Sequence, residues 1–227
     1  MKRTFFNSKS KDKQYLVIGC GRFGSSVAKK MCQLGNEVMV IDKDEDSINN
    51  IAELVTHTAI VDVTEERDLK SIGLGNFDVV IVAISSDIRA SIMATVMAKE
   101  MGVPKVVCKA KDELQAKVLY KIGADKVVFP ERDMGIRLAY NLASENILDQ
   151  INLDPEYSIM EIVTPQNWVG KTIIELNLRA KYDITVLAVK TQSGLKVMPS
   201  PNYKMQEKNI LIIIGNTDKI SDIILHD

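Results

Sequence analysis

The sequence has few of the side chains from which metal centres and catalytic sites are built. It has three cysteines, Cys20, Cys32 and Cys108, and two histidines, His57 and His226. The odd cysteine count and the wide spacing argue against a disulfide framework and against a zinc motif. We expect Cys20 and Cys108 to be buried thiols of a protein in a reducing cytoplasm. No Ser/His/Asp or Cys/His set is indicated, so the sequence does not favour an enzyme.

Long apolar runs and an excess of one charge are also missing. The longest runs, Val79–Ile84 and Ile210–Ile214, are far too short to cross a bilayer and fit buried strands. The net charge of -1 provides no general attraction to nucleic acid, which is not expected as a partner. Residues 1–13 are rich in lysine but have no apolar centre, so they are interpreted as a basic, mobile arm and not as a secretory signal.

A glycine-rich turn, Gly-Cys-Gly-Arg-Phe-Gly at positions 19–24, follows the first predicted strand. Gly19 permits a tight turn, Gly21 lets the backbone approach a pyrophosphate, and Gly24 lets the next helix pack closely on the strand. Asp42 closes the following apolar run, where it can accept a hydrogen bond from a ribose hydroxyl. No P-loop lysine follows the glycines, so hydrolysis of that type is not expected. The turn predicts a nucleotide site.

Other polar residues follow predicted strands at the carboxyl edge of the sheet, where doubly wound folds bind their ligands. Asp62 and Thr64 either contact adenine or ribose, or form a turn and a helix cap. Ser85, after Ala83, either borders the ligand or, like Ser86, caps the next helix. Lys109 either contacts a phosphate or is a surface lysine.

Two charged residues near this edge also have two interpretations each. Arg22 either is a solvated residue at a helix start or reaches phosphate oxygens with its forked donors. Glu131, together with Asp133, either compensates a helix dipole or helps to bind a cation.

Strands and helices alternate up to about residue 129, which predicts an α/β fold with a Rossmann-like, doubly wound parallel sheet. Strands are expected at 14–18, 38–42, 57–61, 79–84, 106–109 and 127–129, and helices at 25–34, 44–54, 65–72, 88–101, 112–122 and 132–148. A turn-rich break at 152–155 then separates a first domain, 14–151, from a second, smaller α+β domain, 156–227. In the second domain we expect strands at 158–163, 185–190, 195–198 and 210–214, and helices at 172–176 and 219–225.

These motifs, in this order, resemble RCK domains (regulators of potassium conductance), and in particular the cytosolic regulatory subunits of Ktr/Trk-type potassium transporters. The resemblance covers nearly the whole chain after the basic arm. It rests on the motifs at 19–24, 40–42, 62–64, 123–125, 130–135 and 173–182.

The resemblance implies that the first domain binds ATP or ADP, with NAD(H) as a weaker alternative. Arg22 would sense the terminal phosphate across a dimer interface. Glu131 would contribute to a site for a divalent cation, Mg or Ca, close to the phosphates. The residues carried over as nucleotide-binding are Gly19, Gly21, Arg22, Phe23, Gly24, Asp42, Lys43, Asp62, Val63, Thr64, Ala83, Ser85 and Lys109.

The resemblance also implies a second ligand and a membrane partner. The second domain is similar to domains that bind cyclic di-AMP between two copies, and the matching positions are Ile173, Ile174, Arg179 and Pro201. Homodimers would assemble into an octameric ring at the inner face of the cell membrane, beneath a potassium transporter subunit. Nucleotide exchange would change the shape of the ring without an enzymatic step. The alternatives are a small NAD(H)-dependent oxidoreductase and a redox sensor that acts on DNA.

Overall fold

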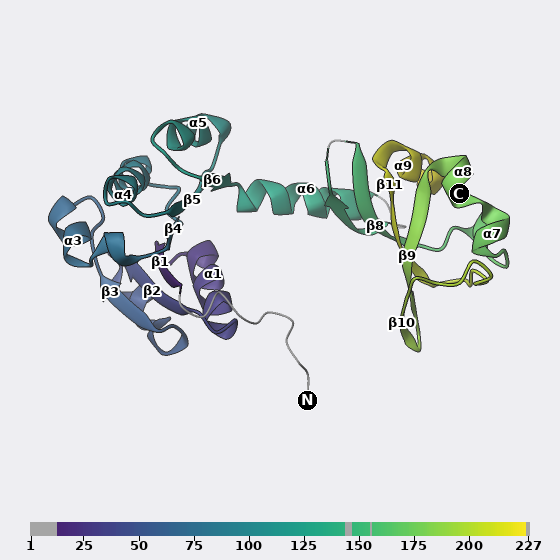
Figure 1. Cartoon of the computed structure of the whole chain (residues 1–227), viewed down its shortest axis with the longest axis horizontal. Helices are drawn as coiled ribbons and strands as arrows, with labels where there is room; N and C mark the ends of the chain where they lie inside the picture. Colours follow the sequence, from purple (N-terminus) through teal and green to yellow (C-terminus); the bar gives the residue numbers. More distant parts are fainter. Residues whose placement is uncertain (1–12, 144–146, 155, 226–227) are drawn as a thin grey trace. The chain divides into compact units, whose positions relative to one another are not determined.

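The computed structural model describes residues 13–143, 147–154 and 156–225 (Figure 1), so the predicted arm at 1–13 lies outside the described residues except for Lys13. The chain divides into two compact units, 1–131 and 132–227. The division lies before the break at 152–155 that the sequence indicated.

The first unit is built on a parallel six-stranded sheet with the order β3-β2-β1-β4-β5-β6. The chain runs outward from β1 to β3 and then returns to place β4 beside β1, which makes this a doubly wound fold, as predicted. A crevice is expected at the carboxyl ends of β1 and β4, because the segments that follow these strands lead to helices on opposite faces of the sheet. The strands are β1 (Gln14–Ile18), β2 (Glu37–Asp42), β3 (His57–Ile60), β4 (Val79–Val82), β5 (Lys105–Lys109) and β6 (Lys126–Val128).

Helices cover both faces of this sheet (Figure 1). On one face Ala28 and Ile48 pack into a core with Val17 and Val40. The helices of this face are α1 (Arg22–Gln33) and α2 (Glu45–Asn49), and those of the other face are α3 (Glu66–Ser71), α4 (Ile88–Glu100) and α5 (Glu113–Lys121). The single helix expected at 44–54 was wrong, because α2 ends at Asn49 and a separate 3₁₀ turn, η1, follows at Ala52–Leu54.

The second unit contains an antiparallel five-stranded sheet with the order β10-β9-β11-β8-β7. Its strands are β7 (Ile147–Asn152), β8 (Tyr157–Val163), β9 (Ile184–Thr191), β10 (Gly194–Val197) and β11 (Ile210–Asn216). Alternate residues of β8 and β11, such as Ile162 and Leu211, are buried with Trp168 and Ile220. Its helices are α7 (Ile173–Leu176), α8 (Leu178–Tyr182) and α9 (Thr217–Leu225), of which the sequence did not predict α8.

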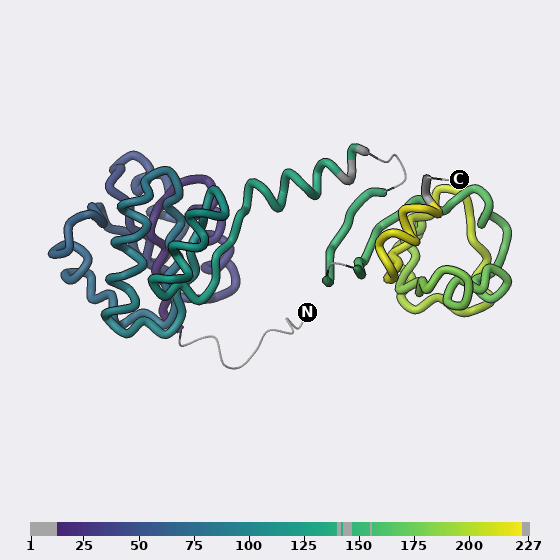
Figure 2. Tube along the Cα trace, turned by 90° about the horizontal axis from the view of Figure 1, so that it is seen from above, coloured from purple at the N-terminus to yellow at the C-terminus, as the bar shows by residue number. Residues whose placement is uncertain are grey.

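The crossover between the sheets differs from the expected long helix at 132–148. Helix α6 spans Pro130–Ala143, which Figure 2 shows as a continuous coil, and β7 follows at Ile147–Asn152. The expectation of helix at 147–148 was wrong because β7 pairs antiparallel with β8 and buries Ile147 and Gln150. These bonds place β7 in the second sheet.

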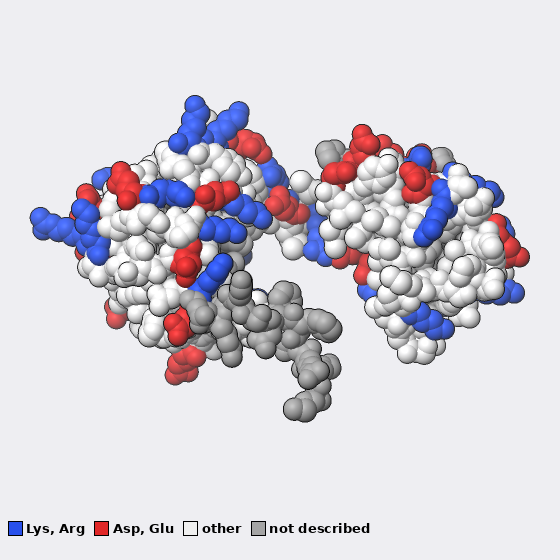
Figure 3. Space-filling view, viewed as in Figure 1, with Lys and Arg blue, Asp and Glu red and all other residues white. Residues whose placement is uncertain are grey.

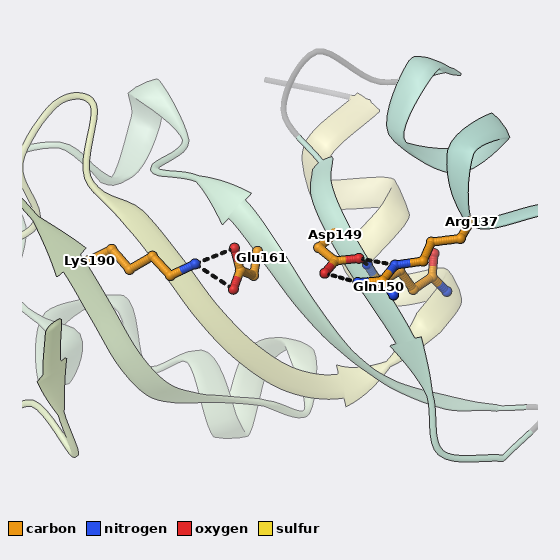
Figure 4. Close-up of polar contacts among 5 residues, drawn as sticks. All are labelled: Arg137, Asp149, Gln150, Glu161 and Lys190. Atoms are coloured by element: carbon orange, nitrogen blue, oxygen red, sulfur yellow. Dashed lines mark hydrogen bonds and ion pairs between the residues drawn. The ribbon is translucent and has the colours of Figure 1, made fainter. Parts of the chain in front are cut away.

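Figure 4 shows two ion pairs of the second unit: one joins α6 to β7, and the other joins β9 to β8. The guanidinium of Arg137 in α6 donates two hydrogen bonds to Asp149 of β7, one of them 2.6 Å from Nε to Oδ1. Asp149 faces Glu161 of β8 across the sheet, and Lys190 of β9 contacts both carboxylate oxygens of Glu161 at 2.6 Å. The two cations offset the repulsion that these neighbouring acids would otherwise cause.

The Arg137–Asp149 pair predicts a pH-dependent contribution to stability. The hydrogen bond from Arg137 lowers the pKa of Asp149, so the contribution is complete above the unfolded-state pKa of about 3.9. It is lost as the pH falls through the lower, folded-state pKa. In urea unfolding, D149N should lower the free energy of unfolding by about 1 kcal/mol at pH 7. This difference should disappear once the pH is below the folded-state pKa of Asp149. A difference that persists there would contradict the assignment.

Neither a membrane-spanning helix among the described residues nor a dominant charge on the face drawn in Figure 3 is seen. Among residues 13–143, 147–154 and 156–225, no helix is both long and apolar enough to cross a membrane. Basic and acidic side chains are interspersed on the face drawn in Figure 3.

Candidate functional site

A cleft of about 320 Å³ opens at the carboxyl edge of the parallel sheet. Its walls are the segments that follow β1, β2, β3, β4 and β5, and its floor includes the buried Ile18 and Ile41. Distant parts of the sequence therefore meet at the carboxyl ends of the neighbouring strands β1 and β4. The predicted site residues that line the cleft are Gly19, Gly21, Asp42, Lys43, Asp62, Val63, Thr64, Ala83, Ser85 and Lys109.

Three predicted residues, Arg22, Phe23 and Gly24, do not line this cleft but form the first turn of α1 beside it. Arg22 is exposed, Phe23 is half-buried and Gly24 is buried. The N-terminal amides of α1 carry a partial positive charge, which favours an anion at this end of the helix.

The glycines of the turn have three different structural roles. Gly19 has a φ of 102°, a left-handed conformation that other residues rarely adopt. Gly24 packs so closely that a Cβ there would lie 1.9 Å from the carbonyl oxygen of Gly19. Gly21 has an ordinary φ of -67°, and a Cβ there would meet no atom of the described residues within 4 Å. The protein itself therefore does not require glycine at position 21, whereas a ligand approaching the backbone would.

Asp42 closes the turn by accepting two backbone hydrogen bonds. Its Oδ2 accepts from the N–H of Cys20 at 2.6 Å and its Oδ1 from the N–H of Asp44 at 3.0 Å. The carboxylate is thus held at the mouth of the cleft, and each oxygen retains a lone pair. Such a group can still accept hydrogen bonds from the hydroxyls of a ribose.

Asp62 forms a local turn and also lines the cleft. Its Oδ1 accepts hydrogen bonds from the N–H of Thr64 at 2.9 Å and from the Thr64 hydroxyl at 2.8 Å. These bonds lower the pKa of Asp62, with smaller contributions from the charges of Lys43 and Arg89. Asp62 does not cap α3, whose N-cap residue is Glu65, so of the expected turn and helix cap the structure shows the turn, and contact of Asp62 with a ligand stays a prediction.

The segment after β4 contributes two cleft residues that the sequence did not single out, Asp87 in the loop and Ala90 in α4. Ile84 and Ser86, on either side of Ser85, also line the cleft. Asp87, and not Ser85 or Ser86, caps α4, because its Oδ1 accepts from the N–H of Ala90 at 3.0 Å. A Ser-Ser-Asp run after a strand could have signalled this, since aspartate is a favoured helix cap.

Lys109 lies on the far wall of the cleft, and its side chain is only 12% exposed. Its Nζ is 2.5 Å from Oε1 of Glu131 and 5.9 Å from the centre of the Phe23 ring. It is therefore not a solvated surface lysine. The hydrogen bond from Lys109, together with the charges of Lys109 and Arg22, lowers the pKa of Glu131.

The divalent-cation site expected at Glu131 is not formed by this chain alone. Within the described residues, no group of three or more His, Cys, Asp or Glu side chains could hold a metal ion. Within one chain, the ammonium group of Lys109 is the partner of the Glu131 carboxylate. The described residues of one chain do not form a cation site by themselves, and the cation stays a prediction.

A second hollow of about 280 Å³ lies in the second unit and brings together all four positions expected for cyclic di-AMP: Ile173, Ile174, Arg179 and Pro201. The Nε of Arg179 donates to the hydroxyl of Thr185 at 3.2 Å, which places the guanidinium at the wall of the hollow. Ile174 is 64% exposed beside it. Apolar surface next to an arginine suits a base and a phosphate.

The fold and the cleft define the class: a two-domain protein with a Rossmann-like, nucleotide-binding type of fold. Residues 15–130 match the TrkA-N domain family and residues 158–224 the TrkA-C domain family. The chain therefore belongs to the TrkA family of RCK-type proteins, found in potassium uptake systems.

Two relatives are similar in sequence to this chain over nearly its full length. The chain is 42% identical over 210 residues to Ktr system potassium uptake protein A of Bacillus subtilis, and 45% identical over 209 residues to Ktr system potassium uptake protein C of the same organism. Each alignment covers 92% of this chain and 95% of the relative.

Solved structures share the fold at low sequence identity. The RCK domain of GsuK has a TM-score of 0.65 at 16% identity, over 99% of this chain and 50% of that one. The GsuK channel bound to NAD has a TM-score of 0.55 at 22% identity, over 97% of this chain and 40% of that one.

Proposed function

We propose that the protein is a cytosolic regulatory subunit of a potassium transporter, and that an adenine nucleotide in the cleft of the first unit is its signal. The observation that carries this proposal is the juxtaposition of Gly21, Asp42 and Lys109 around one cleft. Gly21 leaves the backbone open to a phosphate, Asp42 accepts from ribose, and Lys109 supplies a positive charge. The relatives named as Ktr potassium uptake proteins support the transport role.

ATP and ADP are favoured over NAD(H) as the regulatory ligands. Arg22 is exposed and begins α1 beside the cleft. Its positive charge would interact more strongly with a terminal phosphate of ATP or ADP than with the uncharged ribose of nicotinamide. NAD(H) stays the second candidate, since a GsuK structure of the same fold is described as bound to NAD. In both cases the nucleotide acts by binding the two states of the subunit with different affinities.

The partner and the assembly follow from the same proposal. We infer that homodimers form an octameric ring at the cytoplasmic face of the membrane, and that a change in ring shape acts on the transporter subunit. The nucleotide would be bound and exchanged, and not consumed. A divalent cation at Glu131 would need additional ligands from a second copy or from the phosphates.

Replacing Arg22 by alanine should reduce the difference in transport activity between the ATP-bound and the ADP-bound protein. We expect the ratio of their transport activities, measured in vesicles that contain the transporter subunit and this protein, to fall by about tenfold, because a lost contact between arginine and phosphate is worth about 1.5–3 kcal/mol. Lys30, exposed in the last turn of the same helix, provides the control K30A. A variant that still discriminates fully would contradict the role of Arg22.

We also propose that the hollow in the second unit binds cyclic di-AMP between two copies and thereby inhibits transport. Arg179 would contact a phosphate, and Ile173, Ile174 and Pro201 would pack against a base. In calorimetry R179A should bind cyclic di-AMP about tenfold more weakly than the parent chain, with unchanged ATP affinity. K181A, in the same short helix but outside this hollow, is the matched control. Equal affinities of R179A and the parent chain would exclude this site.

A further inference from the structure

Lys109 belongs both to the cleft and to the start of the crossover helix. It ends β5 at the carboxyl edge of the sheet and lines the cleft with a largely buried side chain. Its ammonium group is 2.5 Å from the carboxylate of Glu131, the second residue of α6. A largely buried ammonium needs an anionic partner, and in this structure Glu131 is that partner.

The two side chains of this ion pair differ strongly in burial. The side chain of Lys109 is 12% exposed and its ammonium group lies against the ring of Phe23. The side chain of Glu131 is 70% exposed, so it can turn into water at little cost in solvation. If an anion enters the cleft, Lys109 stays in place and Glu131 is the group that leaves.

We propose that Lys109 exchanges partners when the cleft fills: a phosphate of the bound nucleotide takes the ammonium group from Glu131 and thereby releases the start of α6. This inference rests on the proposed function, which supplies the phosphate. One ammonium group cannot neutralise two anions, and a phosphate beside Lys109 also repels the carboxylate of Glu131. Filling of the cleft therefore removes the ion pair that holds the start of α6.

The surroundings of α6 give this release a route to the second unit. The chain divides between Glu131 and Arg132, directly after the ion pair. Residues 131–139 are all exposed, so little packing holds the first turns of the helix. Further along, Arg137 ties α6 to Asp149 of the second sheet (Figure 4). Release of the start of α6 thus loosens the first end of a helix whose later part is paired with the sheet of the second unit.

A double-mutant cycle on ADP affinity tests the exchange. Titrations are made in EDTA, so that no divalent cation bridges Glu131 to the phosphates. E131Q should tighten ADP binding by about threefold to fivefold, because Lys109 no longer has a partner to leave. K109M, which keeps the buried aliphatic volume, should weaken binding by about tenfold. In the K109M background, E131Q should change the affinity by less than about twofold.

Hydrogen exchange provides a second readout that general electrostatics would not change. ADP should accelerate amide exchange at residues 134–139 in the parent chain, whereas in E131Q exchange should already be fast without ADP. Glu66, exposed and paired with Lys70 outside the cleft, gives the control E66Q, which should leave both measurements unchanged.

The outcomes separate this inference from the proposed function. If the parent chain binds neither ADP nor ATP, the proposed function fails and the exchange fails with it. If ADP binds, but E131Q weakens binding or has the same effect in both backgrounds, only the exchange is overturned.

Discussion

Replacing Gly24 by alanine is expected to destabilise the first unit by about 3 kcal/mol. The added methyl group would lie 1.9 Å from the carbonyl oxygen of Gly19 and 3.0 Å from the Cβ of Ala83. Neither group can rotate away, because one is a backbone oxygen and the other is a Cβ attached directly to the backbone. Helix α1 would have to move off the sheet and open the turn. Urea unfolding of the full chain measures the loss.

Gly135 supplies the control for this experiment. It lies in the exposed helix α6, and a Cβ there would meet no atom of the described residues within 4 Å. G135A should therefore stabilise the chain slightly, by about 0.5–1 kcal/mol, because alanine is the better helix former. A G24A variant that unfolds at the same urea concentration as the parent chain would contradict the close packing of α1 on the turn.

Replacing Gly21 by alanine should leave the fold intact and lower nucleotide affinity by about a hundredfold. The φ of -67° is one that alanine adopts freely, and the added methyl group has open space around it. That space is where the backbone would receive a phosphate, so a bound nucleotide would meet the methyl group directly. Calorimetry with ATP measures the loss of affinity.

The two glycine variants separate folding from binding within one turn. Urea unfolding of G21A should differ from that of the parent chain by no more than about 0.5 kcal/mol, since a small loss at the helix cap is offset by a less flexible unfolded chain. If G21A bound ATP as tightly as the parent chain does, the phosphates would not lie on this turn.

The parts of the cleft that could be predicted are those encoded by local sequence. The turn at 19–24 and Asp42 follow from the spacing of glycines and an acid around two strands, because each of these residues acts on its immediate neighbours. The same is true of Asp62, whose partner Thr64 is two residues away. Strand–helix alternation was sufficient to predict the parallel sheet.

The remainder depends on contacts between distant residues. Lys109 and Glu131 are 22 positions apart, and no local pattern shows that they form an ion pair. Residues 147–148, the start of β7, were expected to be helical because the apolar residues Ile147, Leu148 and Ile151 also suit a helical period, and only the pairing with β8 makes this segment a strand. Asp87 was overlooked because two serines precede it and fit the same capping role.

The central claim, that the cleft is a site for a regulatory adenine nucleotide, is tested most directly by titrating the purified chain with ATP, ADP and NADH in a calorimeter, with G21A in parallel. We expect ATP and ADP to bind the parent chain without being consumed, and G21A to lose the binding of both. Binding of NADH alone, or ATP binding that is unaffected in G21A, would contradict this claim.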